Sequence, residues 1–151
     1  MKKYIYIILI PLLFLSCDYK PIYSKKNNYN FMIEKIDLNG DREINNLIDK
    51  KLKKFQNKEN EKKFSISAIS SYEKISQSKD LSGKTTDYLV IINVFFEIKK
   101  ENEVKKFTSK EEFLIKNFSN KFDENNLEKI KKENLIDLII SRLVIQLSQI
   151  E

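Results

Sequence analysis

Apolar and polar residues alternate along four stretches of this chain, and each stretch is predicted to form a β-strand. The alternation is cleanest in residues 64–72, where Phe64, Ile66 and Ala68 alternate with serines. A period of two places successive side chains on opposite faces of a strand, so one face of this strand is expected to be buried. The other three predicted strands cover residues 31–38, 87–99 and 104–118.

The four predicted strands differ in what their faces carry. Residues 31–38 hold two apolar sets, which are Met32, Ile36 and Leu38 on one face and Phe31 and Ile33 on the other. Residues 104–118 bring Phe107, Phe113 and Ile115 into one register, with charged residues between them. Residues 87–99 are apolar on both faces, because Leu89, Ile91 and Phe95 lie opposite the main set. This favours a central strand, or one whose second face meets a partner.

Two further stretches repeat their apolar residues at helical spacing. The first covers about 41–55, and Asp41 is a good N-cap for it. The second runs from a cap at Asp123 to about Ile150, long enough to cross a whole sheet. Its predicted stripe is Leu127, Ile130, Asn134, Leu135, Leu138, Ile139, Arg142, Leu143, Ile145, Gln146, Leu147 and Ile150.

Polar connections separate these elements. Gly40 ends the first strand, residues 100–103 form a hairpin turn, and the polar stretch 76–86 is expected to be a long loop. The resulting order is β-α-β-β-β-α. It predicts one α+β domain over residues 31–151, a two-layer sandwich with two helices packed on a four-stranded, mostly antiparallel sheet.

The N-terminal stretch has a different pattern, typical of a bacterial export signal. Lys2 and Lys3 precede an apolar run at 4–15, and a small residue, Ser16, stands before Cys17. As a helix that run would cover only about 18 Å, short of the roughly 30 Å hydrocarbon core, and Pro11 interrupts it. We therefore expect a signal peptide over 1–16, followed by an extended tether over 17–30.

Cys17 is the only cysteine of the chain, and it stands where lipoproteins are acylated. The sequence Phe14-Leu15-Ser16-Cys17 resembles a lipobox, although leucine is the usual residue where Phe14 stands. The simpler alternative is an uncleaved signal anchor with an incidental cysteine. We predict that Cys17 carries a diacylglycerol and an acyl chain, which together give a permanent membrane anchor, and that there is no other cofactor.

The composition argues against catalysis. The chain has no histidine and, once Cys17 is acylated, no thiol, so the commonest base, nucleophile and metal ligands are missing. Two glycines cannot build a phosphate-cradling loop. The acidic pairs Glu111-Glu112 and Asp123-Glu124 suit a strand and a helix start, where both are structural. We predict a binding protein that is not an enzyme and has no metal site.

The basic character of the chain comes almost entirely from lysine. The formal charge is +6, and Arg42 and Arg142 are the only arginines. Arginine is preferred for bidentate contacts to phosphates and base edges, so a nucleic-acid partner is not expected. The lysines either fill solvated faces or meet an anionic envelope partner such as a phosphorylated glycolipid.

The segment Cys17-Asp18-Tyr19-Lys20-Pro21-Ile22-Tyr23 resembles the opening of alphaproteobacterial members of the LptE family, the lipopolysaccharide-assembly lipoproteins. The resemblance continues in the order of elements through nearly all of the chain after Cys17. It implies a lipoprotein of the outer membrane that faces the periplasm, plugs and helps assemble the LptD β-barrel, and supports lipopolysaccharide transport to the cell surface.

The resemblance also suggests which lysines to test. The candidates for contact with lipopolysaccharide are Lys79, Lys84, Lys99, Lys100, Lys105 and Lys106. Asp18 departs from the family's usual glycine, and in enteric bacteria aspartate there is associated with retention in the inner membrane. The alternative function is therefore a lipid-anchored auxiliary component of an inner-membrane transporter or another envelope complex.

Overall fold

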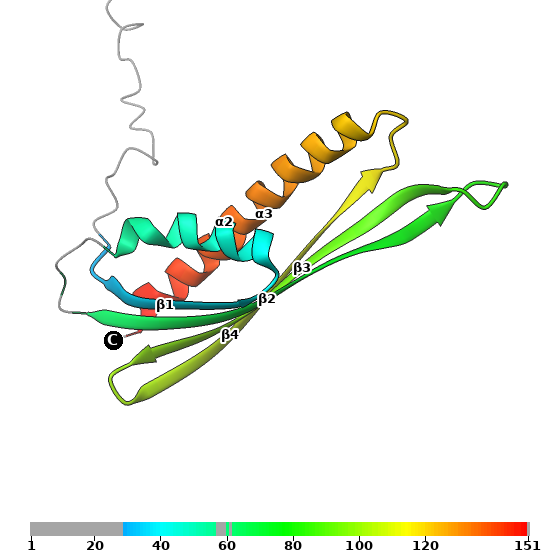
Figure 1. Ribbon diagram of the computed structural model, residues 1–151. Helices are drawn as coiled ribbons and strands as arrows, with labels where there is room; N and C mark the ends of the chain where they lie inside the picture. Colours follow the sequence, from blue (N-terminus) through cyan, green and yellow to red (C-terminus); the bar gives the residue numbers. More distant parts are fainter. Residues whose placement is uncertain (1–28, 57–59, 61, 151) are drawn as a thin grey trace, which may run out of the picture.

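The computed structural model describes residues 29–56, 60 and 62–150, and it confirms the predicted α+β fold (Figure 1). The predicted signal peptide, Cys17 and nearly all of the tether lie outside these residues. The elements follow the order β-α-β-β-β-α, with a short 3-10 turn after the first helix. They are β1 Met32–Gly40, α2 Arg42–Leu52, η3 Lys53–Phe55, β2 Lys63–Lys79, β3 Thr85–Lys100, β4 Glu103–Lys116 and α3 Lys121–Gln149.

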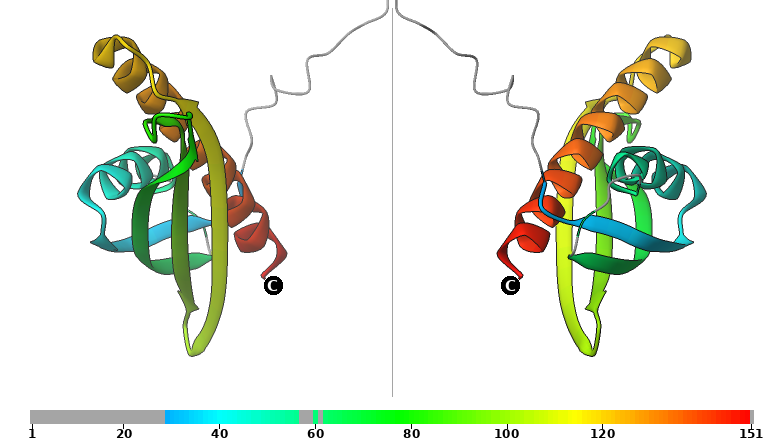
Figure 2. Two further views of the ribbon diagram at one scale, coloured as in Figure 1. Left: turned by 90° about the vertical axis from the view of Figure 1, so that its right-hand side faces the viewer. Right: turned by 90° about the vertical axis from the view of Figure 1, so that its left-hand side faces the viewer.

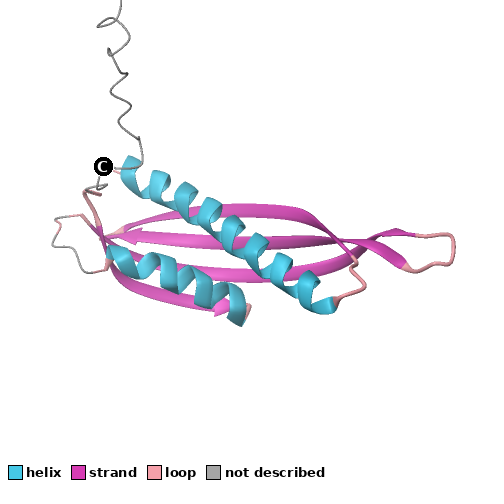
Figure 3. Ribbon diagram, turned by 90° about the horizontal axis from the view of Figure 1, so that it is seen from above, coloured by secondary structure: helices cyan, strands magenta, loops and turns pink. Residues whose placement is uncertain are grey.

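The four strands form one sheet in the order β1-β2-β3-β4. β1 runs parallel to β2, because α2 carries the chain back between them, while β2–β3 and β3–β4 are antiparallel hairpins. Both helices lie on the same face of the sheet (Figure 3). The second apolar face of β3, which carries Leu89, Ile91 and Phe95, is thus left without a helix over it.

The core lies between the helices and the sheet. Phe64, Ile66 and Ala68 of β2 lie next to Ile98 and Phe96 of β3, and all five are at most 2% exposed. The other buried members of this cluster are Phe31, Ile33, Ile44, Ile48, Leu52, Phe55, Ile92, Val94, Ile136, Ile139, Ile140, Leu143, Leu147 and Ile150. Most helical residues of this set recur at spacings of three or four, which confirms the amphipathic pattern of α2 and of the second half of α3.

The predicted faces of β1 were wrong, because a bulge interrupts the strand. Ile33 pairs with Phe64, but Lys35, two residues later, pairs with Ser65 next to it, so Glu34 is an extra residue. After the bulge Ile36 pairs with Ile66. Ile33 and Ile36 therefore both point to the helix side, where the alternation alone had placed them on opposite faces.

The predicted long loop at 76–86 was also wrong. β2 continues to Lys79 and β3 begins at Thr85, so that only a short turn joins them. Residues 76–79 are exposed and polar on both sides, so they carry no hydrophobic alternation that could mark a strand. The two strands form a long hairpin that projects beyond α2 (Figure 1).

The two helix starts gave one correct and one wrong prediction. Asp41 is the N-cap of α2, and its side chain accepts a hydrogen bond of 2.9 Å from the Ile44 amide. The cap of α3 is Asn120 and not Asp123: the Asn120 side chain accepts from the Phe122 amide at 3.0 Å and donates to Asp123 at 2.9 Å. Asparagine and aspartate are both good N-caps, so the sequence does not tell which of the two begins the helix. The observed cap lies three residues before the predicted one.

The buried stripe of α3 differs from the prediction along the whole helix, and most of all in its first half. Ile130, Leu138 and Ile145 are at least half exposed. The buried residues near the start are instead Glu124, Glu128 and Lys132. The helix crosses the sheet obliquely (Figure 2), and its first half lies beyond the apolar core. Among the described residues, no helix combines the length and the apolar character needed to cross a membrane.

Candidate functional site

The structure divides the six predicted glycolipid-contact lysines between the two ends of the sheet. Lys79 and Lys84 flank the turn between β2 and β3, which we call the distal end. Lys99, Lys100, Lys105 and Lys106 flank the turn between β3 and β4, which with the start of β2 forms the proximal end. β3 joins the two ends and has 16 residues, so they are about 50 Å apart. The six lysines therefore fall into two separate groups.

The distal end exposes an apolar tip between lysines. Asp80 holds the turn, because its carboxylate accepts from the backbone amides of Ser82 and Lys84 at 2.9 and 3.0 Å. The Ser82 hydroxyl also donates to this carboxylate. Its hydrogen bond, together with those from the backbone amides, lowers the pKa of Asp80. Leu81 at the tip is fully exposed. A turn that presents a leucine between Lys79 and Lys84 suits a partner with apolar and anionic groups.

More apolar side chains are exposed on the sheet face that has no helix. Ile75 of β2, Leu89 of β3 and Leu114 of β4 are neighbours in one row across this face, and Ile75 and Leu114 are 44% and 63% exposed. Ile69, 58% exposed, lies beside Phe95 in another row. Exposed apolar rows on a sheet are typical of surfaces that contact another molecule.

Below the distal hairpin, α3 is joined to the sheet by buried charges. Lys74 of β2 donates to Glu124 at 2.9 Å and to Glu128 at 2.7 Å, and the Tyr72 hydroxyl donates to Glu128 at 2.6 Å. Lys132 lies 3.4 Å from Glu128. We call Tyr72, Lys74, Glu124, Glu128 and Lys132 the polar network. It holds the first half of α3 to β2 where the apolar core no longer reaches.

The polar network extends to both helices and to two aromatic rings. Lys132 donates to Glu43 of α2 at 2.6 Å, and Lys121 donates to Glu124 at 2.7 Å. The Lys132 ammonium lies 5.0 Å from the ring centre of Tyr72, and that of Lys74 lies 4.8 Å from the ring centre of Tyr88. Cations over aromatic faces at this distance are attracted by the ring quadrupole.

The charges of the polar network shift one another's pKa values. The hydrogen bond from Lys121, with those from Lys74 and the Phe118 amide, lowers the pKa of Glu124 to about 2. Burial alone would raise the pKa of Glu128, but hydrogen bonds from Lys74 and Tyr72 outweigh it and the pKa is lowered. Burial would likewise lower the pKa of Lys74, yet the bonds to Glu128 and Glu124 raise it. Both carboxylates are thus ionised in the folded domain at neutral pH.

These shifts predict acid sensitivity. Because the folded pKa values of Glu124 and Glu128 are lowered, their contribution to stability is complete above the ordinary value of 4.5 and is lost as the pH falls toward about 2. We expect the midpoint of thermal unfolding to be constant from pH 7 to 5.5 and to fall by about 5 °C or more by pH 2.5. Circular dichroism melts check this. A Glu124→Gln variant must show a shallower fall, and an equal fall would mean that other carboxylates cause it.

The acidic pairs of the sequence have structural positions. Glu111 points to the helix side of β4 and makes an ion pair with Arg142 of α3, while Glu112 points to the other face and lies 3.4 Å from Lys110. Within the described residues, no three acidic side chains lie close enough together to hold a metal ion. The absence of enzyme activity stays a prediction.

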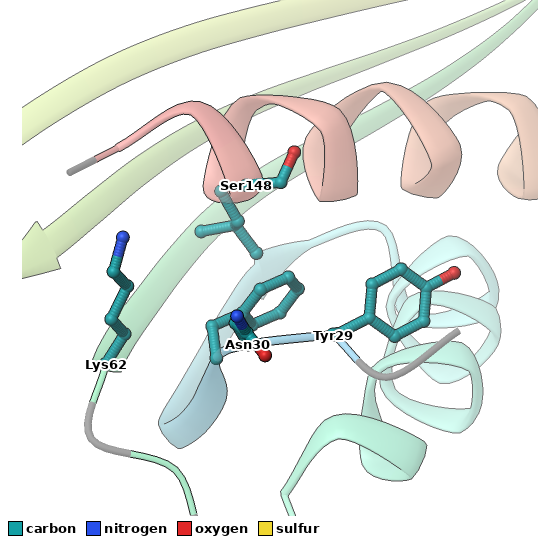
Figure 4. A pocket seen from close by; sticks show the side chains of 6 residues that line it. Tyr29, Asn30, Lys62 and Ser148 are labelled. Atoms are coloured by element: carbon teal, nitrogen blue, oxygen red, sulfur yellow. The ribbon is translucent and has the colours of Figure 1, made fainter. Parts of the chain in front are cut away.

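The chain segment that leads into β1 is fastened to the proximal end. Asn60 donates to the carbonyl oxygens of Tyr29 and Phe31 at 3.1 and 3.3 Å, and the Phe31 ring stacks on Phe55 at 5.5 Å. A pocket of about 280 Å³ lies here between Tyr29, Asn30, Phe31, Lys62, Leu147 and Ser148 (Figure 4). Lys62 helps to cap the C-terminus of α3, since it donates to the Ile150 carbonyl at 3.3 Å.

The six predicted lysines lie in two groups at opposite ends of the sheet, and the sequence pattern did not predict the polar network. A signal for it exists in the sequence, because Glu124, Glu128 and Lys132 recur at a spacing of four and so share one helix face. The predicted stripe of α3 does not include these three residues. Only the position of Lys74, on the helix side of the extended β2, shows that the face is covered.

Comparison with solved structures shows a shared fold. The structure resembles that of rare lipoprotein B from Shewanella oneidensis, with a TM-score of 0.55 and 15% identity over 74% of this chain and 95% of that chain. Lipoprotein B from Nitrosomonas europaea matches with a TM-score of 0.47 and 13% identity, covering 82% of this chain and 91% of that one. A minor lipoprotein from Acinetobacter baumannii matches with a TM-score of 0.43 and 18% identity, covering 76% of this chain and 92% of that one.

The first of these likenesses shows that the domain has the fold of rare lipoprotein B. No protein-family model matches the chain, and no curated protein sequence matches it either.

Proposed function

We propose that this chain is an outer-membrane lipoprotein, anchored through Cys17, which plugs and helps assemble an LptD-type β-barrel and so supports lipopolysaccharide transport to the cell surface. The observation that carries the proposal is the fold that this chain shares with rare lipoprotein B. The structural match covers 95% of that protein's chain. That protein is named a lipoprotein, and the lipobox-like sequence that ends at Cys17 supports the same kind of anchor in this chain.

The surface of the domain suits a plug inside a wet barrel. Its exposed face mixes the apolar row of Ile75, Leu89 and Leu114 with lysines and glutamates, such as the exposed pair of Lys110 and Glu112. Lipopolysaccharide carries phosphates and acyl chains, and the distal end offers Lys79 and Lys84 beside Leu81. In this proposal the distal lysines meet phosphates as point charges.

Co-purification tests the barrel partnership. The chain is tagged after Glu151, extracted in mild detergent and analysed for partners at one-to-one stoichiometry. We expect a large β-barrel protein in the outer-membrane fraction. Recovery alone, or with subunits of an inner-membrane transporter, would instead favour the auxiliary-component alternative that Asp18 suggests. An Asp18→Gly variant then tells whether this residue directs sorting.

The lipid anchor gives a separate prediction. Replacing Cys17 with serine removes the acylated sulfur, so we expect at least a tenfold loss from the outer-membrane fraction and no incorporation of labelled palmitate. Ser24→Ala, beyond the cysteine, is the matched control and should behave as the unmodified chain. Mass spectrometry of the mature N-terminus is decisive, since a chain that keeps Met1 is an uncleaved signal anchor.

A further inference from the structure

A pocket of about 360 Å³ at the proximal end carries charges of both signs. It is lined by Glu34, Lys63, Ser65, Lys99, Lys100 and Glu101. Phe64 and Ile66 point into the core. Lys63, just before Phe64, and Ser65, between the two, therefore point to the sheet face without helices. Lys99 pairs with Ser65 across the strands and lies on the same face.

The sheet register brings several hydrogen-bond donors to one place in this pocket. Ser65 lies between Lys35 of β1 and Lys99 of β3, and neighbours in such a row have Cβ atoms about 5 Å apart. Lys63 is two residues before Ser65 on the same face. In the part of the chain that the structure describes, the ammonium groups of Lys63 and Lys99 make no hydrogen bond or ion pair. They are therefore available to an anionic group.

The two carboxylates decide which anion fits. Glu34 is the bulged residue of β1, and Glu101 stands in the β3–β4 turn with a φ of 51°. A simple anion bound to the lysines would be repelled by both glutamates. A ligand that carries an ammonium two carbons from its phosphate would instead satisfy both signs of charge.

We propose that this pocket binds a phosphoethanolamine group, with the phosphate held by Lys63, Lys99 and the Ser65 hydroxyl, and the ammonium held by Glu34 and Glu101. A cavity of this size suits a headgroup rather than a whole lipid. Lys63 pairs with Met32, three residues after Tyr29, so the pocket lies at the end where the chain from the predicted anchor enters the domain. An ethanolamine phospholipid of the anchoring membrane is therefore the natural source.

Binding of soluble headgroups to the full chain in a maltoside detergent tests this proposal. The probes are glycerophosphoethanolamine, inorganic phosphate and ethanolamine, and calorimetry measures the affinity of each. We expect glycerophosphoethanolamine to bind at least fivefold more tightly than the other two. Lys63→Gln with Lys99→Gln should weaken it at least fivefold, while Lys79→Gln with Lys84→Gln, an equal charge change at the distal end, should not. Equal affinity for inorganic phosphate, or an equal loss in the distal variant, would overturn the proposal.

Two further measurements separate the two halves of the site. Glu34→Gln with Glu101→Gln should abolish the preference for glycerophosphoethanolamine over inorganic phosphate. In nanodiscs, hydrogen exchange of residues 62–66 and 98–101 should be slower with phosphatidylethanolamine than with phosphatidylcholine, whose methylated nitrogen cannot donate hydrogen bonds. Identical exchange in both lipids would contradict the assignment. None of these readouts depends on a barrel partner, so they can fail or succeed independently of the proposed function.

Discussion

Replacing Glu128 with leucine is expected to lower the free energy of unfolding by about 3 kcal/mol. Glu128 accepts from Tyr72 at 2.6 Å and from Lys74 at 2.7 Å, and Lys132 lies 3.4 Å away. Its side chain is 12% exposed, so water replaces little of what is lost. The leucine would leave the half-buried Tyr72 hydroxyl without an acceptor, and the ammonium groups of Lys74 and Lys132 would each lose one counter-charge. Urea unfolding followed by circular dichroism measures the change.

A triple variant tells whether this loss comes from unpaired charge. Tyr72→Phe, Lys74→Met and Glu128→Leu together remove the donors with the acceptor, while Glu124 keeps Lys121 and Lys132 keeps Glu43. Apolar replacement of a whole buried ion cluster is often neutral, so we expect stability within about 1 kcal/mol of the native chain. Lys129→Leu, at the next and exposed position of α3, is the control and should change little.

The outcome can contradict this account in two ways. A loss below about 1 kcal/mol in the single variant would mean that the polar network contributes little to stability. A triple variant as unstable as the single one would mean that packing, not unpaired charge, is lost. Hydrogen exchange of residues 121–132 locates the effect, because the first half of α3 should open before the apolar core does.

The order of elements was predictable because each core-facing segment carries a clear period. In β2, Phe64, Ile66 and Ala68 mark a strand without help from the rest of the fold, and Asp41 marks the start of α2. The strand ends beyond the core were not predictable, because residues 76–79 are polar on both faces. There the strand is specified by pairing with β3 and by the turn that Asp80 holds, and neither leaves an apolar period in the sequence.

The candidate site was predictable only in part. Composition shows that lysine supplies the positive charge, yet strand register decides which lysines meet. Lys99 meets Lys63, which lies 36 positions earlier, and is about a sheet length from Lys79. The bulge at Glu34 shifts the register by one residue and so places Lys35, not Glu34, beside Ser65. A single inserted residue of this kind has no signature in the hydrophobic pattern.

Gly40 carries the second large effect that we expect, since Gly40→Ala should lower the free energy of unfolding by about 3 kcal/mol or more. Gly40 has a φ of +101°, which residues with a side chain rarely adopt. A Cβ at this position would also overlap the backbone carbonyl oxygen of Ser70. That oxygen accepts from the Asp41 amide at 3.1 Å, and the buried Ser70 hydroxyl donates to Asn45 at 2.7 Å. The substitution therefore strains the junction that joins β1, α2 and β2.

Gly83→Ala is the matched control for this effect. Gly83 also has a positive φ, +83°, but a Cβ there meets nothing within 4 Å. It tests the backbone conformation alone, for which we expect a cost of about 1 kcal/mol. Thermal and urea unfolding of both variants separate the two terms. If Gly40→Ala costs no more than Gly83→Ala, the contact with Ser70 is loose and does not fix the junction. If it costs more by about 2 kcal/mol, the close approach of β1 to β2 is what requires glycine.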